Sequence, residues 1–451
     1  MSKRAALLLV LVFAAALCLV SPGPSVKAVS EAPLLSWGKT YGNIQGYSVA
    51  QSADGGYVIA AAYAIYAKMA YTDGKAVLIK TNSSGSIEWN KTIGEYPNSQ
   101  TLINTRDGGF AVVQSNYDPK DPNSAESKII SCLIKTDVDG NLQWSQVFGE
   151  SSSVYLNSIV EKSEGSYVLA GYTQSSSVYG DNALVIKTDS DGNLQWSRKY
   201  ENGSRIVSIV EAADGGYVVG GGFDGKLWLG KLNQVGIIQW EKKYNAYGGA
   251  NFLIETRDGG YALGGTSGSV VKTDSEGNIQ WNRTYVNGKQ GARFDCAVEA
   301  EEGGYVLAGA SVFTTSRGWL VKTDSRGNVE WNATYSGLGE SSVSSLKQTS
   351  DGGYVFTGKT SIAHDYATNI WLAKTTPSPQ PNSQDNTPTK PTGSFPTLMV
   401  IAVSVAVVAV VAVAVLVYFK KHNRQDQNGF SSTQRSRFDC RFCPQVLQVS
   451  F

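Results

Sequence analysis

The sequence predicts an all-β protein: a seven-bladed β-propeller closed by its own N-terminal strand, followed by one C-terminal transmembrane helix. A phrase of the type D-G-G-Y-V recurs seven times between residues 54 and 355. A tryptophan-bearing segment around Trp37 stands before the first copy, whereas the last copy has none after it. An uncharged run of mainly valine and alanine occupies 398–419. These observations indicate, in turn, the repeat architecture, its closure and a membrane anchor.

The N-terminal segment is typical of a secretion signal. Lys3 and Arg4 supply positive charge, and an unbroken apolar run covers 5–20. Val26 and Ala28 lie three residues and one residue before a plausible cleavage point. We therefore predict that 1–28 is a signal peptide and that the chain is exported. A retained anchor helix stays open as the alternative, whereas Cys18 does not form a lipoprotein site because Leu17 precedes it.

Each repeat contains three phrases that suit four short antiparallel strands. The first is a tight glycine turn that begins at Asp54, Asp107, Glu164, Asp214, Asp258, Glu302 and Asp351. The second is an apolar pair before a lysine, at Lys80, Lys135, Lys187, Lys231, Lys272, Lys322 and Lys374. The third is a turn that leads to a tryptophan, at Trp89, Trp144, Trp196, Trp240, Trp281 and Trp331. Alternating apolar residues flank the turns without a helical period, so each unit predicts one propeller blade.

Trp37 indicates how the ring closes. The segment 36–41 has the wording of a fourth strand but no unit precedes it, and the last unit ends at Thr375 without its tryptophan strand. If the N-terminal strand joins the last unit, seven complete blades result and no sheet edge stays open. We therefore predict a propeller domain over 33–376.

The wording of the repeat resembles the D-G-G-Y-V…K-T-D-x-x-G-N-x-x-W repeats of prokaryotic, especially archaeal, surface propeller proteins. The resemblance covers about residues 34–375, and it implies the propeller architecture and a place on the cell surface. It implies no particular activity, because propellers host many unrelated functions.

The C-terminal part predicts a membrane anchor. A stretch rich in proline, threonine and serine at 377–397 reads as an extended stalk. The uncharged run 398–419 is long enough to span a bilayer, and Lys420, Lys421 and Arg424 follow it at once. The residues 420–451 are then a short cytoplasmic tail, in which Cys440 and Cys443 have no assigned role. The chain is thus expected to be a single-pass type I protein of the cell membrane with an extracellular ectodomain.

Several short sequence patterns resemble known modification, metal or catalytic sites. Glycosylation sequons occur at Asn82, Asn90, Asn202, Asn282 and Asn332. Two turns, at 137–141 and 189–193, resemble parts of a calcium loop, but the equivalent turns at 82–85 and 233–236 lack carboxylates, so turn formation explains all copies. No catalytic constellation or cofactor motif is found, and His364 and His422 are the only histidines. We predict no metal, no cofactor and no enzyme activity; the formal net charge of +1 predicts no nucleic-acid partner.

The expected binding surface is the face that carries the long connections. The D-G-G and G-N turns are short in every copy and fall on one face, whereas the variable connections fall on the other. These loops and their ends supply the candidate ligand-binding residues Tyr66, Tyr71, Tyr117, Asp118, Tyr179, Asp181 and Tyr366. Tyrosine-bearing loops on a rigid scaffold are typical of recognition, although solvated loops without a role would show the same composition.

Three functions stay open at this stage. The first is a binding or adhesion module for a glycan or a surface protein. The second is a structural component of the cell envelope, and the third is a propeller enzyme with an unrecognised active site in the central channel. A pocket or ligand in the channel would favour the enzyme.

Overall fold

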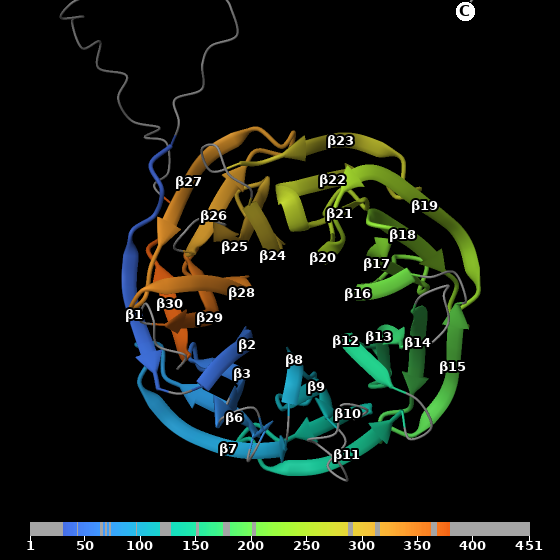
Figure 1. Ribbon diagram of the computed structural model, residues 1–451, viewed down its shortest axis with the longest axis horizontal. Coiled ribbons are helices and arrows are strands. Elements are labelled where there is room, and N and C mark those ends of the chain that lie inside the picture. The colour runs from blue at the N-terminus through green and yellow to red at the C-terminus, as the bar shows by residue number, and fades with distance from the viewer. Residues whose placement is uncertain are drawn as a thin grey trace, which may run out of the picture. The chain divides into compact units, whose positions relative to one another are not determined.

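Seven antiparallel sheets of four strands each form a ring in the computed structural model (Figure 1). The structure describes residues 30–378 apart from 43, 64–65, 68–69, 72–73, 96, 118–127, 150–152, 175–180, 201–203, 287–291, 312–315 and 362–367. By its contacts the chain divides into Met1–Pro381 and Asn382–Phe451, and every described residue belongs to the first unit. The protein is therefore an all-β seven-bladed propeller.

The predicted anchor segments cannot be placed in this structure. The signal peptide 1–28, the span 398–419, the tail 420–451 and all but the first two residues of the stalk lie outside the described residues. Within the described part of the chain, no helix is long and apolar enough to cross a membrane.

The strands follow the blade order that the repeats predict. Blade one comprises β2 (Ile44–Gln51), β3 (Tyr57–Tyr63), β6 (Lys75–Thr81) and β7 (Ile87–Glu95). Blade two comprises β8 (Pro97–Asn104), β9 (Phe110–Tyr117), β10 (Ile129–Thr136) and β11 (Leu142–Phe148). Blade three comprises β12 (Val154–Glu161), β13 (Tyr167–Thr173), β14 (Asn182–Thr188) and β15 (Leu194–Tyr200). Blade four comprises β16 (Ser204–Glu211), β17 (Tyr217–Phe223), β18 (Lys226–Leu232) and β19 (Ile238–Tyr247). Blade five comprises β20 (Ala250–Glu255), β21 (Tyr261–Gly265), β22 (Ser269–Thr273) and β23 (Ile279–Thr284). Blade six comprises β24 (Ala292–Glu299), β25 (Tyr305–Ser311), β26 (Arg317–Thr323) and β27 (Val329–Tyr335). Blade seven comprises β28 (Glu340–Gln348), β29 (Tyr354–Ser361), β30 (Asn369–Thr375) and β1 (Leu35–Tyr41). Two short strands, β4 (Tyr66–Ala67) and β5 (Ala70–Tyr71), and the 3-10 turn η1 (Thr266–Gly268) lie in connections.

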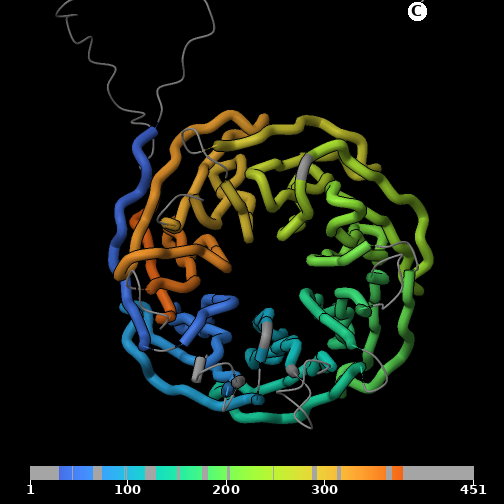
Figure 2. Tube along the Cα trace, viewed as in Figure 1, coloured from blue at the N-terminus to red at the C-terminus, as the bar shows by residue number. Residues whose placement is uncertain are grey.

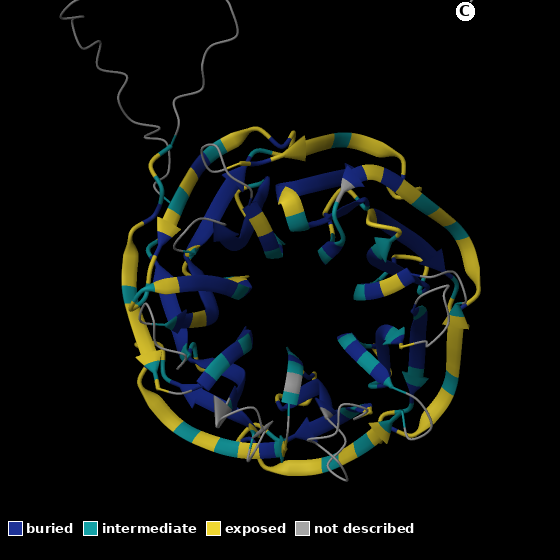
Figure 3. Cartoon of the chain, in the orientation of Figure 1, coloured by how far each residue is buried: buried dark blue, intermediate teal, exposed yellow. Residues whose placement is uncertain are grey.

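Within each blade the first strand lines the axis of the ring and the fourth forms its outer wall (Figure 1). The two middle strands are almost wholly buried, whereas the outer strands are mostly exposed (Figure 3). The buried side chains form seven clusters, each made by residues of two neighbouring blades. The core therefore lies between blades, and no blade can bury its apolar faces alone.

The N-terminal strand closes the ring, as predicted. Strand β1 pairs with β30 in antiparallel register from Leu35↔Thr375 to Tyr41↔Ile370. The start and the end of the described chain consequently lie side by side in blade seven (Figure 2). On the axis side, the backbone N–H of Val49 in blade one donates to the hydroxyl of Ser345 in blade seven at 3.2 Å. The ring is thus joined at its outer and at its inner wall.

The lysine and glycine-turn phrases meet inside each blade. Lys272 has a side chain that is 1% exposed, and its Nζ lies 2.8 Å from Asp258 Oδ2. The same ammonium donates to the carbonyl of Thr273 at 2.7 Å and to Gln280 Oε1 at 2.8 Å. Six of the seven repeats pair the lysine with the turn carboxylate, and the exception is Lys322, which bonds the carbonyl of Gly303 and pairs with Glu330. The repeated lysine is therefore a structural residue.

The tryptophan phrase fastens each blade to the next one. The ring of Trp144 in blade two lies 5.9 Å from the ring of Tyr167, the tyrosine that follows the glycine turn of blade three. In five blades a tyrosine four residues after the tryptophan donates its hydroxyl to a main-chain carbonyl beside the next blade: Tyr41, Tyr200, Tyr244, Tyr285 and Tyr335. The D-G-G-Y and W phrases are thus two halves of one contact between blades.

Two separate constraints require glycine at the turn between the third and fourth strands: the backbone conformation and the close contact with a tryptophan. Gly277 has a φ of +77°, and a Cβ built there would lie 2.9 Å from the ring of Trp240. Gly259, in the other short turn of the same blade, has a φ of +75° with nothing within 4 Å of such a Cβ. The two positions share the backbone conformation and differ in the contact with tryptophan.

This difference gives a matched test of the contact between blades. We expect Gly259→Ala to cost about 1 kcal/mol, because alanine resists a positive φ. Gly277→Ala should cost about 2–4 kcal/mol, because the added methyl group also displaces Trp240. Urea unfolding of both variants measures the gap. Equal losses would show that the tryptophan contact adds nothing to the stability of the ring.

Candidate functional site

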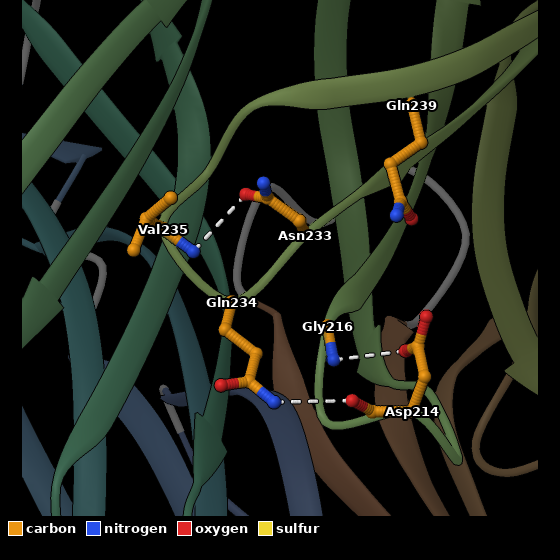
Figure 4. A pocket seen from close by; sticks show the side chains of 6 residues that line it. All are labelled: Asp214, Gly216, Asn233, Gln234, Val235 and Gln239. Atoms are coloured by element: carbon orange, nitrogen blue, oxygen red, sulfur yellow. Dashed lines mark hydrogen bonds between the residues drawn. The ribbon is translucent and has the colours of Figure 1, made fainter.

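The two faces of the ring differ in how their polar atoms are used. The short turns form one face, here called the short-turn face. In blade four it has a crevice of about 330 Å³ lined by Asp214, Gly216, Asn233, Gln234, Val235 and Gln239 (Figure 4). Its polar atoms bond within the turns: Gly216 N–H donates to Asp214 Oδ1 at 2.9 Å and Val235 N–H to Asn233 Oδ1 at 3.1 Å. The crevice therefore has few groups to offer a ligand.

The calcium-like turns also use their own oxygens. Asp137 Oδ1 accepts the N–H groups of Asp139 and Asn141, at 3.0 and 2.8 Å. The Asn141 amide donates to Asp137 Oδ2 at 2.9 Å, and Asp189 repeats the arrangement with Asp191 and Asn193. Among the described residues, no group of three or more His, Cys, Asp or Glu side chains is placed to hold a metal ion. Turn geometry explains these carboxylates.

The opposite face, here called the loop face, carries the predicted ligand-binding residues. Tyr66 and Tyr71 pair with each other across β4 and β5, and Tyr117 ends β9. The side chains of these three residues are outside the described set. Asp118, Tyr179 and Tyr366 lie outside the described residues altogether. Of the seven candidates, Asp181 alone has a described side chain.

Asp181 belongs to a cluster at the rim of the loop face between blades three and four. It is buried and forms an ion pair with Arg205, whose side chain is 62% exposed. The Arg205 guanidinium lies 5.0 Å from the centre of the Tyr172 ring, and Tyr172 stacks on Tyr155 at 4.7 Å with 9° between the planes. Burial raises the pKa of Tyr172 to about 12. The cluster presents a cation on a rigid aromatic stack.

A pocket of about 300 Å³ opens on the loop face between blades six and seven. Its lining combines two cations, one carboxylate and several hydroxyls: Arg293, Lys359, Glu340, Ser316, Ser341, Ser342, Ser361, Thr368 and the methyl group of Ala310. Within the described part of the chain, no hydrogen bond or salt bridge is formed by the side chains of Lys359 and Glu340, although the charge of Lys359 acts on the Asp295 carboxylate. These two charged groups are the ones in the pocket that a ligand could use directly.

Arg293 is held in place by a carboxylate at the edge of this pocket. Its Nη2 lies 2.8 Å and its Nε 3.0 Å from Asp295 Oδ2, and Asn251 Nδ2 donates to Asp295 Oδ1 at 3.1 Å. Burial raises the pKa of Asp295, and the charge of Arg293 partly opposes that rise. The Arg293 side chain is 48% exposed. It can therefore keep its contact with Asp295 and still donate to a ligand anion.

The sequence predicts binding residues in the loops and at their ends, whereas the polar groups of the two clusters described above lie mainly at strand ends. Tyr155, Arg205 and Arg293 are the second residues of their first strands, and Arg205 and Arg293 pair with Gly222 and Ala310. An alignment of the seven blades would show that this one position changes from blade to blade among glutamine, asparagine, tyrosine, arginine and serine. That variation at a fixed place in a regular repeat is the signal that was missed.

The sequons occupy two kinds of position. Asn90, Asn282 and Asn332 are exposed on the outer strands β7, β23 and β27, each directly after the tryptophan. Asn82 Oδ1 accepts the N–H groups of Ser84 and Ser86, both at 3.0 Å, so this side chain also shapes its turn. Asn202 lies outside the described residues.

Comparison with known proteins supports the fold. No protein-family model matches the chain, and no curated protein matches its sequence. The solved structure of the WD40 β-propeller domain of Doa1 is similar, with 12% identity, a TM-score of 0.50, and coverage of 75% of this chain and 96% of that one. That of BamB from Moraxella catarrhalis has 12% identity and a TM-score of 0.43 over 75% of this chain and 99% of that one. The chain is a β-propeller. At these identities the likeness concerns the fold alone.

Proposed function

We propose that this propeller is a recognition module that binds a glycan or another surface protein through its loop face. The observation that carries the proposal is the pocket between blades six and seven, where the side chains of Lys359 and Glu340 make no hydrogen bond or salt bridge with the described residues. Two cations and a row of hydroxyls suit a ligand that has hydroxyls and a negative charge, such as an acidic sugar or an acidic side chain. The Arg205 cluster gives the same face a second cation on an aromatic stack.

We further propose that the module is displayed on the outside of the cell. The sequence features that support this are the signal peptide, the stalk, the span 398–419 and the basic residues after it. The same display is implied by the resemblance of the repeats to those of prokaryotic surface propeller proteins. In this arrangement the stalk holds the ring away from the membrane, and the loop face is free to meet a partner.

A structural role in the cell envelope is the second candidate. It is supported by the exposed outer-wall asparagines Asn90, Asn282 and Asn332, which are suited to carry glycans. An enzyme is the third candidate, because no group of acid, base and nucleophile emerges from the sequence. Recognition ranks first, since a coat protein does not need charged groups without partners in a pocket.

The binding test uses the segment 29–378, which contains every strand of the ring. It is applied to a glycan array with neutral and uronic-acid sugars and to an envelope extract from its own source. We expect the double variant Arg293→Ala/Lys359→Ala to bind the retained ligand about 10- to 100-fold more weakly, as the loss of two charge-assisted hydrogen bonds implies. Arg326→Ala is the matched control, because Arg326 is exposed on the short-turn face of the same blade.

The outcomes separate the candidates. A loss that is confined to the double variant assigns recognition to the pocket between blades six and seven. Equal binding by the wild type and the double variant would remove that pocket from the proposal. Binding to nothing in either panel would favour the structural role over recognition.

A further inference from the structure

Blade seven contributes a regular grid of four side chains to the pocket between blades six and seven. In the pairing of β28 with β29, Glu340 lies opposite Ser361. Two residues further along the strands, Ser342 lies opposite Lys359. Residues two apart on a strand point to the same side of a sheet, and all four side chains line the pocket. The carboxylate and the ammonium therefore occupy opposite corners of the grid, and a serine occupies each of the other two corners.

The two opposite charges of the grid do not pair with each other. Diagonal positions on neighbouring strands lie about 7–8 Å apart, a distance that long side chains can bridge. Within the described part of the chain, however, neither Glu340 nor Lys359 forms a salt bridge or a side-chain hydrogen bond. The charge of Lys359 acts on Asp295, but that carboxylate already accepts hydrogen bonds from Arg293 at 2.8 Å and from Asn251 at 3.1 Å. The pocket thus offers a ligand one positive and one negative group at two separate points.

Hydroxyl groups complete the lining of the pocket. Ser342 is only 6% exposed, and its hydroxyl makes no hydrogen bond with any residue that the structure describes. The same holds for the hydroxyls of Ser316, Ser361 and Thr368. A hydroxyl can both donate and accept, so these groups match the hydroxyls of a sugar. The volume of about 300 Å³ is at the small end of ligand sites, which suits a single sugar unit.

The charges of the pocket discriminate against ligands that carry one sign of charge. A ligand with a carboxylate alone is attracted by Lys359 but meets Glu340 as a like charge, and like charges brought together in a small site oppose binding. A ligand with an ammonium alone meets Lys359 and Arg293 in the same way. A ligand with both groups turns each repulsion into an attraction.

We propose that this pocket selects a zwitterionic sugar unit, an amino-uronic acid whose carboxylate pairs with Lys359 and whose ammonium pairs with Glu340. The ring hydroxyls of the sugar bond to the serine and threonine hydroxyls between these two groups. Arg293 uses its Nε and Nη2 on Asp295 and keeps the N–H groups of Nη1 for the ligand. The inference rests on the proposed recognition of a glycan by this pocket, and it names the class of sugar.

The test uses four monosaccharides that differ only in their charged groups. Galactosaminuronic acid carries both groups, galacturonic acid carries the carboxylate, galactosamine carries the ammonium, and galactose carries neither. Ligand-observed NMR titrations of the full chain measure the four affinities. We expect galactosaminuronic acid to bind about 10-fold more tightly than either singly charged sugar, as one additional charge-assisted contact implies. Galactose should bind most weakly, and added salt should reduce the differences.

Two variants assign each charge of the sugar to its partner. Glu340→Gln should remove the preference for galactosaminuronic acid over galacturonic acid, because the ammonium loses its counter-charge. Lys359→Met should remove the preference over galactosamine, because the carboxylate loses its partner. The matched controls are Lys226→Met, at an exposed position of blade four, and Glu276→Gln, at an exposed turn of blade five. Neither control should change any of the four affinities.

The outcomes separate this inference from the proposed function. Equal affinities of the wild type for galactosaminuronic and galacturonic acid would overturn the inference, and so would a preference that survives Glu340→Gln. If galacturonic acid still binds in either case, the proposed recognition of a glycan stands. Binding of none of the four sugars would overturn the inference too, and the envelope extract would then decide the proposed function by itself.

Discussion

A chain that lacks residues 34–42 is expected to melt about 10 °C or more below the intact chain, which is the largest effect that we predict. The deletion removes β1, and with it the outer strand of blade seven and its pairing with β30. It also removes Trp37, whose ring lies 5.8 Å from that of Tyr57 in blade one. In the intact ring the Tyr335 hydroxyl donates a hydrogen bond to the carbonyl of Pro33 at 2.6 Å. This bond should be lost as well, because Pro33 is no longer held in place by the strand that follows it. The exposed edge of β30 should also promote aggregation.

The melting experiment has a simple control. A deletion of the same length at 382–390 lies outside Met1–Pro381, the unit that contains the ring, and should leave the melting temperature unchanged. Calorimetry of both variants measures the difference. If the 34–42 deletion melts with the intact chain, β1 contributes nothing to closure and the other contacts of blade seven hold the ring by themselves.

Replacement of Lys272 by methionine is expected to lower the free energy of unfolding by about 2–4 kcal/mol. Methionine fills most of the volume of the lysine stem but cannot donate, so the carbonyl of Thr273 and the amide of Gln280 lose a buried partner. Lys226→Met, at an exposed strand end, should change stability by less than about 0.5 kcal/mol. Urea unfolding with a common slope measures both values. A small loss at Lys272 would mean that the repeated lysine acts through its alkyl stem.

Acid provides an independent check of the same ion pair. Partial burial raises the pKa of Asp258, but its hydrogen bonds with Lys272, Thr256 and the Gly260 N–H, together with the charge of Lys272, outweigh that effect, and the folded pKa is lowered to about 2. Because the folded pKa lies below the unfolded one, the pair stabilises the protein above about pH 4, and that contribution is lost as the pH falls towards 2. Lys272→Met should therefore show a weaker loss of stability than the wild type between pH 5 and pH 2. Parallel unfolding curves for the two proteins over that range measure the difference.

The architecture could be predicted because a few residues recur at equivalent positions in the repeats. The D-G-G turn, the lysine and the tryptophan recur once per blade, and six of the seven lysines pair with the carboxylate of the turn. Trp37 alone was enough to predict the closure. The strand that carries it has no repeat before it, and the last repeat is the one that lacks a tryptophan strand. The likeness of the blades is what makes such reasoning reliable.

The roles of the repeated residues were harder to predict. The sequence shows that a lysine such as Lys272 follows a turn carboxylate such as Asp258 in each repeat, but it does not show that the two side chains meet. Their contact depends on the register in which the second and third strands of the blade pair, which the sequence does not state. A bulge in each first strand, such as that between Phe294 and Cys296, also shifts the later side chains by one position. The contacts of Arg293 depend on this shift and could not be read from alternation.

The candidate sites escaped prediction for a related reason. Arg205 meets Tyr172, and Arg293 faces Lys359, across the boundary between two blades. Contacts between neighbouring repeats link residues far apart in the chain, and each is made by positions that differ from blade to blade.

The position of β1 has a consequence for how the chain acquires its structure. The strand is synthesised first, yet its partner β30 is synthesised last, and the bond between the Thr376 hydroxyl and the Leu34 carbonyl joins residues 342 positions apart. Six blades can assemble in order along the growing polypeptide, whereas the seventh must wait for both ends. Closure is therefore the step with the greatest contact order, and it should be the slowest in refolding. Until it occurs, the nascent ring is open and its first strand has nothing to pair with.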